Sequence, residues 1–329
     1  MRIFLAIVWS ALLLAGCGAT GGNAGNSSMN EDSVKAETSD ADSGVAVPEF
    51  MADSAYAYIK RQVDFGPRVP NSPAHDAACN WLAAELSRHG ADVKIQNATL
   101  TGFDGTQLKC SNIFGSFNPE LTDRILLFAH YDTRPWADND PVKENRNKPL
   151  SGANDGASGV AVLLETARLI SANNLNKGID ILFTDCEDYG TDGDEDSWAL
   201  GARYFANNPI KPGYRPSAAI LLDMVGGRDA VFPAEYFSRQ SAPALDDALR
   251  AAAARCGYAG MFPNVIGSAV TDDHVELIKT GIPAIDIIDY RSDSGFCPTW
   301  HTLDDNINNI DPATLKAVGQ TLTEYLFQR

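Results

Sequence analysis

The sequence has 329 residues, 44% of them hydrophobic, and its 43 acidic against 26 basic side chains give a formal net charge of −17. This balance, with no stripe of lysine and arginine, excludes nucleic acid from the expected partners. Six cysteines are present without a Cys-x-x-Cys pair, which excludes a thiolate zinc finger.

Residues 1–16 have the features of a bacterial lipoprotein signal peptide. Arg2 supplies the positive start, residues 3–14 are apolar, and Leu-Ala-Gly-Cys at 14–17 matches the cleavage box. The apolar stretch is shorter than the about 20 residues that span a bilayer. We therefore expect Cys17 to become the lipidated first residue of the mature protein. This would anchor the chain to the bacterial cell envelope, facing the periplasm, with the outer membrane as the expected location. The alternative is an ordinary secretory signal with an incidental cysteine.

Residues 17–47 are predicted to be a flexible tether, because this stretch is rich in Gly, Ser, Asn, Asp and Glu and has few large apolar residues. The remaining residues, 48–329, are enough for one large catalytic domain with a substantial core. Without Cys17, five cysteines remain, an odd number, so at least one thiol should be free unless it is modified or pairs between chains.

Helical patterns and strand-like runs alternate through residues 48–329, which predicts an α/β fold. Helices are expected over 52–63, 74–89, 242–255 and 313–327, and paired strands over 92–100 and 107–114. Short apolar runs at 125–129, 179–183, 219–222 and 284–288 are typical of buried strands. A glycine-rich turn, 151–159, leads into a further helical pattern from Val160.

Acids and histidines follow these runs where each stops. His130 follows the first run, Glu187 and Asp188 the second, and Asp223 the third. The glycine-rich turn carries a further acid, and the stretch 298–306, which looks exposed, carries a histidine; these two are Asp155 and His301. Any one such acid is best explained as a turn residue. Together they indicate a zinc site, because strand ends meet at one edge of an open α/β sheet and zinc binds nitrogen and carboxylate ligands.

Seven motifs resemble the zinc-dependent glutaminyl cyclases, which share the fold of the aminopeptidase branch of metallopeptidases. The resemblance runs from about Phe65 to the C-terminus. Its markers are Phe65-Gly66-Pro67-Arg68-Val69-Pro70, His130-Tyr131-Asp132, residues 152–159, Asp185-Cys186-Glu187-Asp188, Leu222-Asp223, Asp272-Asp273-His274 and Trp300-His301-Thr302-Leu303-Asp304-Asp305. It implies a three-layer α/β fold in which helices flank a mixed, mostly parallel sheet.

The resemblance also implies an activity: cyclisation of an N-terminal glutamine of a peptide or protein to pyroglutamate, with release of ammonia. One catalytic zinc per chain would be held by Asp155, Asp188 and His301. Glu187 would be the proton shuttle. Asp272, with Asp223 beside it, would form a carboxylate network that helps ammonia leave, and one of this pair should have a raised pKa. Trp300 would wall the substrate pocket.

Two positions depart from the family pattern. Asp188 stands where animal members have glutamate, and Asp286 stands where the family has a histidine behind the site. The main alternative function is a two-zinc aminopeptidase, in which His130 and Asp223 hold a second metal, Asp155 bridges and Glu187 activates water. The Asp272-Asp273-His274 triplet and Trp300 favour the cyclase. A lipid-anchored binding protein with a structural metal is a third class, and it would leave Glu187 idle.

Two loops near these motifs are interpreted as solvated surface. The loop 135–149 follows the His130 motif and could flank a pocket, but its individual residues are expected to face solvent. The acidic run 192–196 lacks the full signature of a calcium loop, which favours a solvated turn.

Overall fold

A mixed sheet of six strands runs through the part of the chain that the structure describes. The computed structural model describes residues 47–291 and 294–328. Within them the strand order is β1-β2-β4-β3-β5-β6. The strands are β1 (Asp92–Thr101), β2 (Gln107–Phe117), β3 (Arg124–His130), β4 (Gly178–Thr184), β5 (Ala218–Asp223) and β6 (Ala284–Ile288), and a separate ribbon pairs β7 (Tyr290–Arg291) with β8 (Gly295–Phe296).

The last four strands in this order are parallel. β1 pairs with β2, and β2 with β4, in antiparallel register, whereas β3 is parallel to both β4 and β5, and β5 to β6. Every residue of β3, β4, β5 and β6 is buried, as expected for continuous apolar strands inside a parallel sheet. His130 lies opposite Thr184, and Asp223 opposite Ile288. The carboxyl ends of these strands therefore meet at one edge.

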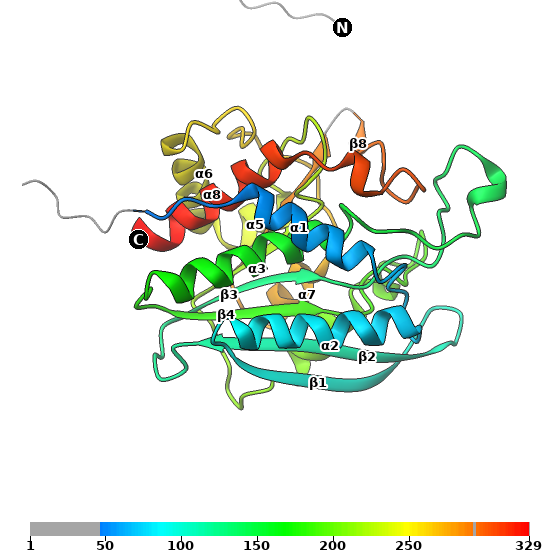
Figure 1. The fold of residues 1–329 in the computed structure, drawn as a ribbon, viewed down its shortest axis with the longest axis horizontal. Coiled ribbons are helices and arrows are strands. Elements are labelled where there is room, and N and C mark those ends of the chain that lie inside the picture. The colour runs from blue at the N-terminus through cyan, green and yellow to red at the C-terminus, as the bar shows by residue number, and fades with distance from the viewer. Residues whose placement is uncertain (1–46, 292–293, 329) are drawn as a thin grey trace, which may run out of the picture. The chain divides into compact units, whose positions relative to one another are not determined.

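Helices cover both faces of this sheet. They are α1 (Ala52–Val63), α2 (Pro73–Arg88), α3 (Ala157–Ala172), α4 (Leu200–Asn207), α5 (Tyr236–Ser241), α6 (Pro243–Arg255), α7 (Asp273–Lys279) and α8 (Pro312–Gln328). Alternate strand residues face opposite layers: Leu127 packs in the cluster that includes α1, α2, α3 and α8, and Phe128 packs with Phe205 of α4 and Leu277 of α7. In Figure 1, α1, α2 and α3 lie in front of the sheet and α7 behind it.

The expected fold is confirmed: three layers with a mixed, mostly parallel sheet in the middle. The four helices predicted by range begin and end within one residue of the expected positions. β2 is three residues longer than expected, because its end pairs with β4, where Phe117 lies opposite Ile179. That extension depends on a partner strand far along the chain.

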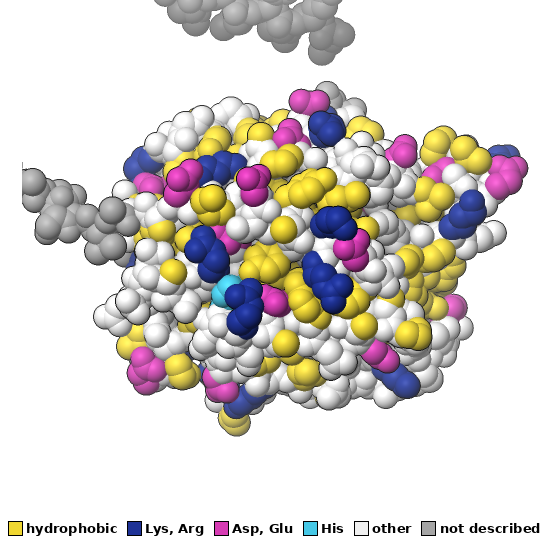
Figure 2. All heavy atoms as spheres, viewed as in Figure 1, with side chains coloured by type: hydrophobic (Ala, Val, Ile, Leu, Met, Phe, Trp, Pro, Cys, Tyr) yellow, Lys and Arg dark blue, Asp and Glu magenta, His cyan; other side chains and the backbone are white. Residues whose placement is uncertain are grey.

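The expected signal peptide (1–16), the lipid site at Cys17 and the tether up to residue 46 lie outside the described residues. In the part that is described, no helix is both long enough and apolar enough to cross a bilayer. The five described cysteines are free thiols: Cys79, Cys110, Cys186, Cys256 and Cys297. On the face shown in Figure 2, basic and acidic side chains are interspersed.

Candidate active site

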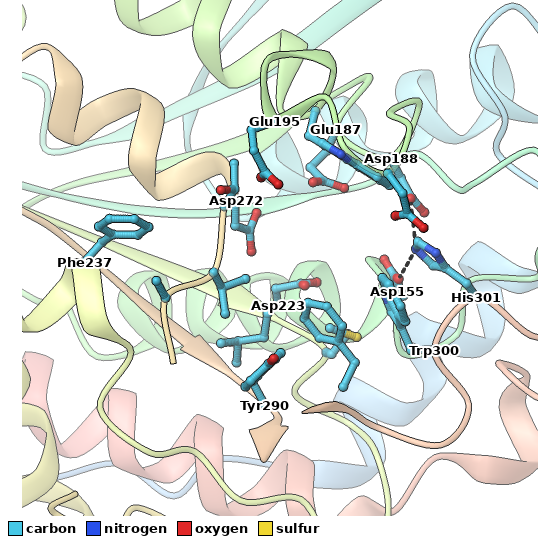
Figure 3. A pocket seen from close by; sticks show the side chains of 18 of the residues that line it. Asp155, Glu187, Asp188, Glu195, Asp223, Phe237, Asp272, Tyr290, Trp300 and His301 are labelled. Atoms are coloured by element: carbon cyan, nitrogen blue, oxygen red, sulfur yellow. Dashed lines mark ion pairs between the residues drawn. The ribbon is translucent and has the colours of Figure 1, made fainter. Parts of the chain in front are cut away.

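The predicted ligands converge at the edge where the parallel strands end. Asp155 precedes α3, Glu187 and Asp188 follow β4, and Asp223 is the last residue of β5. His301 comes from the segment between β8 and α8. Figure 3 shows these side chains around one cavity, with Asp155, Asp188 and His301 close together on one side.

Asp155, Asp188 and His301 form a buried triad whose ligand atoms all lie within 4.8 Å of one another. Nε2 of His301 is 3.2 Å from Oδ1 of Asp188 and 3.8 Å from Oδ2 of Asp155. Both carboxylate oxygens of Asp188 are buried and have no hydrogen-bond partner. One imidazole nitrogen and the carboxylate oxygens of two buried acids fit the donor set of a catalytic zinc with an open position.

A second buried triad shares Asp155 with the first. Nε2 of His130 lies 3.0 Å from Oδ1 of Asp155 and 3.2 Å from Oδ1 of Asp223, and the three residues form another group that could hold a metal. Asp155 thus stands between two potential sites. The geometry alone accommodates one zinc or two.

Glycines let the ligand-bearing segments approach each other. A Cβ at Gly156 would lie 2.3 Å from the carbonyl oxygen of His130, and one at Gly159 would lie 2.1 Å from that of Leu222. Both contacts are with backbone, which cannot move aside as a side chain can. The glycine-rich turn therefore brings the start of α3 against the ends of β3 and β5, which places Asp155 beside both histidines.

Buried charged side chains fix the backbone of the ligand loops. Asp305 accepts hydrogen bonds from the backbone N–H groups of Asn154 (2.7 Å) and Asp155 (3.2 Å). Asp132 accepts from the N–H groups of Glu187 (3.1 Å) and Asp188 (3.2 Å).

The guanidinium of Arg68 links the end of β3 to the glycine-rich turn. It is fully buried and donates to the carbonyl oxygens of Tyr131, Ser151 and Gly152. Arg68, Asp132 and Asp305 all lie within the motifs quoted above, but their roles as loop supports could not be read from the sequence.

The expectation that the individual residues of loop 135–149 face solvent holds for 141–144 and 146–149, which are exposed, but it is wrong for the part of the loop around 137–140. Oδ1 of Asp138 lies 3.5 Å from Nδ1 of His301, and the buried guanidinium of Arg134 holds Asp138 and donates to the carbonyl of Asp188. The buried carboxylate of Asp140 accepts from the N–H of Leu303. The loop thus braces the segment that carries His301.

The stretch 298–306 is likewise less exposed than expected. His301 is 3% exposed, Thr302 5% and Asp305 1%. Polar side chains can be buried here because their partners come from loops far away in the sequence, Asp138 for His301 and the backbone at 154–155 for Asp305.

Three further acids line the cavity beside the triad of Asp155, Asp188 and His301. They are Glu187, Asp223 and Asp272. Burial raises the pKa of Glu187 well above its usual range, and the charges of Asp272 and Asp188 add to this while His130 opposes it. Burial also raises the pKa of Asp223 to about 7. The hydrogen bond with His130 lowers this pKa, and the charge of Asp272 raises it further. The pKa of Asp272 is raised too, again chiefly by burial. Acids of this kind can exchange protons near neutral pH.

The cavity in front of these acids has a volume of about 320 Å³. Trp300 lines it and stacks on His301, with ring centroids 3.9 Å apart. Its apolar walls also include Trp198, Phe237, Val270, Tyr290 and Phe296. The acidic turn 192–196 is exposed, as expected, but Asp192 and Glu195 also border the cavity. The site is thus a half-open pocket with apolar walls and with carboxylates and His301 at one end (Figure 3).

Comparison with known proteins matches this chain to a family of zinc exopeptidases and glutaminyl cyclases. The model of Peptidase family M28 matches residues 112–326. The chain is 50% identical to the crystal structure of Bacteroides thetaiotaomicron glutaminyl cyclase bound to N-acetylhistamine, over 86% of this chain and 99% of that one, with a TM-score of 0.84. It is 51% identical to a Zn-dependent exopeptidase from Parabacteroides distasonis, over 86% and 100%, with a TM-score of 0.85. Glutaminyl-peptide cyclotransferase from Bos taurus is 26% identical over 294 residues, which cover 79% of this chain and 78% of that protein.

Proposed function

The chain belongs to peptidase family M28, among its glutaminyl cyclases, and we propose that it cyclises N-terminal glutamine with a zinc ion held by Asp155, Asp188 and His301. The substrates are peptides or proteins with an N-terminal glutamine, and the products are the pyroglutamyl chain and ammonia. The observation that carries the assignment of residues is the buried triad at one end of a pocket with apolar walls, with an acid of raised pKa next to it.

The reaction places few demands on this site, because nucleophile and electrophile belong to the same residue. When bound, zinc supplies a Lewis acid for the side-chain amide. The walls, including Trp300, hold the glutamine side chain folded toward its own α-amine, so that a five-membered ring can close.

Glu187 is the group placed to move the proton. The attacking amine must lose a proton and the leaving amide nitrogen must gain one, so one carboxylate between them can do both. Its neighbour Asp188 is a proposed ligand, which fixes Glu187 at the edge of the metal site. Asp223 and Asp272 line the same cavity and can hydrogen-bond the nitrogen that leaves as ammonia.

One observation favours a second candidate, the two-zinc aminopeptidase. It is the triad of His130, Asp155 and Asp223, which could hold a second ion. The comparisons support this alternative less well, since glutaminyl cyclases recur among both the similar structures and the similar curated proteins.

A paired assay separates these functions. The enzyme is given a peptide with N-terminal glutamine and, separately, leucine amide, and the metal in the same sample is counted. We expect equal amounts of ammonia and pyroglutamyl peptide, no cleavage of leucine amide, and one zinc per chain at the proposed triad. Two tightly held zincs with cleavage of leucine amide would identify an aminopeptidase instead.

We also propose that the protein is a lipoprotein of the bacterial envelope, with the lipid on Cys17 and the catalytic domain in the periplasm. The support is the cleavage box at 14–17 behind a short apolar stretch. Metabolic labelling with a radioactive fatty acid should mark the wild-type protein and not Cys17→Ser. Equal labelling of both proteins would remove the proposal.

A further inference from the structure

A buried polar cluster lies behind the pocket, made of Glu235, Asp272, His274 and Asp286. Glu235 precedes α5, Asp272 and His274 are at the start of α7, and Asp286 is in the middle of β6. None of the four is more than 4% exposed. Asp272 also lines the cavity (Figure 3), so the cluster reaches from the pocket into the interior.

Four atoms of this cluster are buried without a hydrogen-bond partner. They are Oδ2 of Asp272, Nδ1 of His274 and both carboxylate oxygens of Asp286. A ligand atom from each of these three residues lies within 4.8 Å of the other two. Buried polar atoms are partnered in the great majority of cases, and an unpartnered group points to a proton, water or ion that completes the arrangement.

The carboxylate of Glu235 already has hydrogen-bond partners of its own, so it does not satisfy the unpartnered atoms of the cluster. Its carboxylate accepts from the backbone N–H groups of Phe237, Ser238 and Val270, and from the hydroxyl of Ser238. Nε2 of His274 lies 3.0 Å from the same carboxylate. The ring is therefore held from one side, and its Nδ1 stays 3.9 Å from Oδ2 of Asp286.

Asp286 faces acids from each element packed against it. The negative groups around it are Asp272 of the α7 cap, Asp223 of β5 and Glu235 before α5, and the imidazole of His274 is the other titratable neighbour. Burial, and then the charge of Asp272, raises the pKa of Asp286 well above its usual range. Two ionised carboxylates only accept hydrogen bonds, whereas a protonated one also donates.

We propose that Asp286 is a neutral carboxyl group that donates its O–H to Oδ2 of Asp272. It acts as a positioning residue: Asp272 stays anionic and fixed at the pocket, with Oδ1 accepting from the N–H of Asp273 and Oδ2 accepting from Asp286. The inference rests on the proposed function in one respect, that Asp272 serves the leaving ammonia. The competing explanation is a cation bound by the cluster. Asp272 would then bind that cation and would not be available to the substrate.

Two substitutions test the role in turnover of an N-terminal glutamine peptide. Asp286→Asn keeps a donor of the same shape, and kcat should stay within about fivefold of wild type. Asp286→Leu removes the donor and should lower kcat about 10- to 100-fold, with KM changed far less, because a hydrogen bond to a charged group is lost. Equal losses in both variants, or none in Asp286→Leu, would overturn the proposal. Thermal melting of each variant confirms that it is folded.

Two measurements on the same proteins do not depend on cyclase activity. The infrared difference between wild type and Asp286→Asn at neutral pH should show the loss of a protonated carboxyl band. The matched control is Asp246→Asn, which removes a buried carboxylate paired with Arg239 and Arg250 and should show no such loss. Zinc per chain should be the same in all of them. Absence of the carboxyl band, or a metal that disappears with Asp286, would refute the neutral carboxyl even if the enzyme is a cyclase.

Discussion

Replacing Asp138 with asparagine tests how the proposed ligand His301 is held. Oδ1 of Asp138 lies 3.5 Å from Nδ1 of His301, on the side of the ring away from the triad, and its side chain is 41% exposed. A carboxylate in this position orients the ring and makes the ligand more basic, and losing such a partner costs about 10- to 100-fold in metal affinity. The distance is long and solvent screens the charge, so we expect the lower end, about tenfold or ~1.4 kcal/mol.

The assay is titration of metal-free enzyme with zinc against a chelator of known affinity. Asp196→Asn is the matched control, because it removes the same charge from the loop beside the cavity at a side chain that is 85% exposed. Its zinc affinity should not change. An unaltered zinc affinity in Asp138→Asn, or the same loss in both variants, would show that Asp138 does not support His301.

Three other predictions concern proton transfer and buried groups. Glu187→Gln keeps the shape of the side chain but cannot carry the proton, so kcat should fall about 10²- to 10⁴-fold with zinc content unchanged; full turnover, or loss of the metal, would contradict the role. Burial lowers the pKa of His75, but its hydrogen bond to Asp185 and the charge of that acid outweigh this and raise the pKa above 6.5. The stabilisation is then fully present below about pH 6.5 and is lost as the pH rises through the raised pKa. The difference in free energy of unfolding between wild type and His75→Gln, from urea titrations, should therefore shrink toward alkaline pH, and a growing difference would reverse the argument. Burial raises the pKa of Cys297 to about 11, so only about 0.1% is thiolate near pH 8. Mass spectrometry should find Cys297 unalkylated in the folded protein and alkylated after denaturation, and rapid labelling of the folded protein would be the contrary result.

The sequence predicted the fold well because its strongest signals are local. The apolar run 125–129 forms a fully buried strand, and the helix predicted over 52–63 has those bounds. The meeting of His130, Asp188 and Asp223 followed from a general property of parallel sheets, in which strand ends share one edge. The choice of Asp155, Asp188 and His301 as the zinc ligands came from the family resemblance, and the structure brings these three together. These features need no knowledge of distant contacts.

The supports of the site could not be predicted because they depend on pairs that are far apart in the chain. Asp138 sits in a polar loop, and nothing nearby in the sequence shows that His301 is its neighbour. Asp305 lies in an Asx-rich turn, where a local capping role is the ordinary explanation, yet it accepts from the backbone about 150 residues away. The spacing in His130-Tyr131-Asp132 was the one local hint of such a support, since Asp132 lies two residues after a candidate ligand.

The segment between β8 and α8 contributes His301 together with Asp305, which fixes the backbone at Asp155. Both are translated near the end of the chain. During synthesis every other candidate ligand leaves the ribosome first. The proposed zinc site is complete only when this segment packs against the rest of the domain. Enzymatic activity should therefore appear only after the last part of the chain has been made. A polypeptide that ends before residue 301 should be inactive.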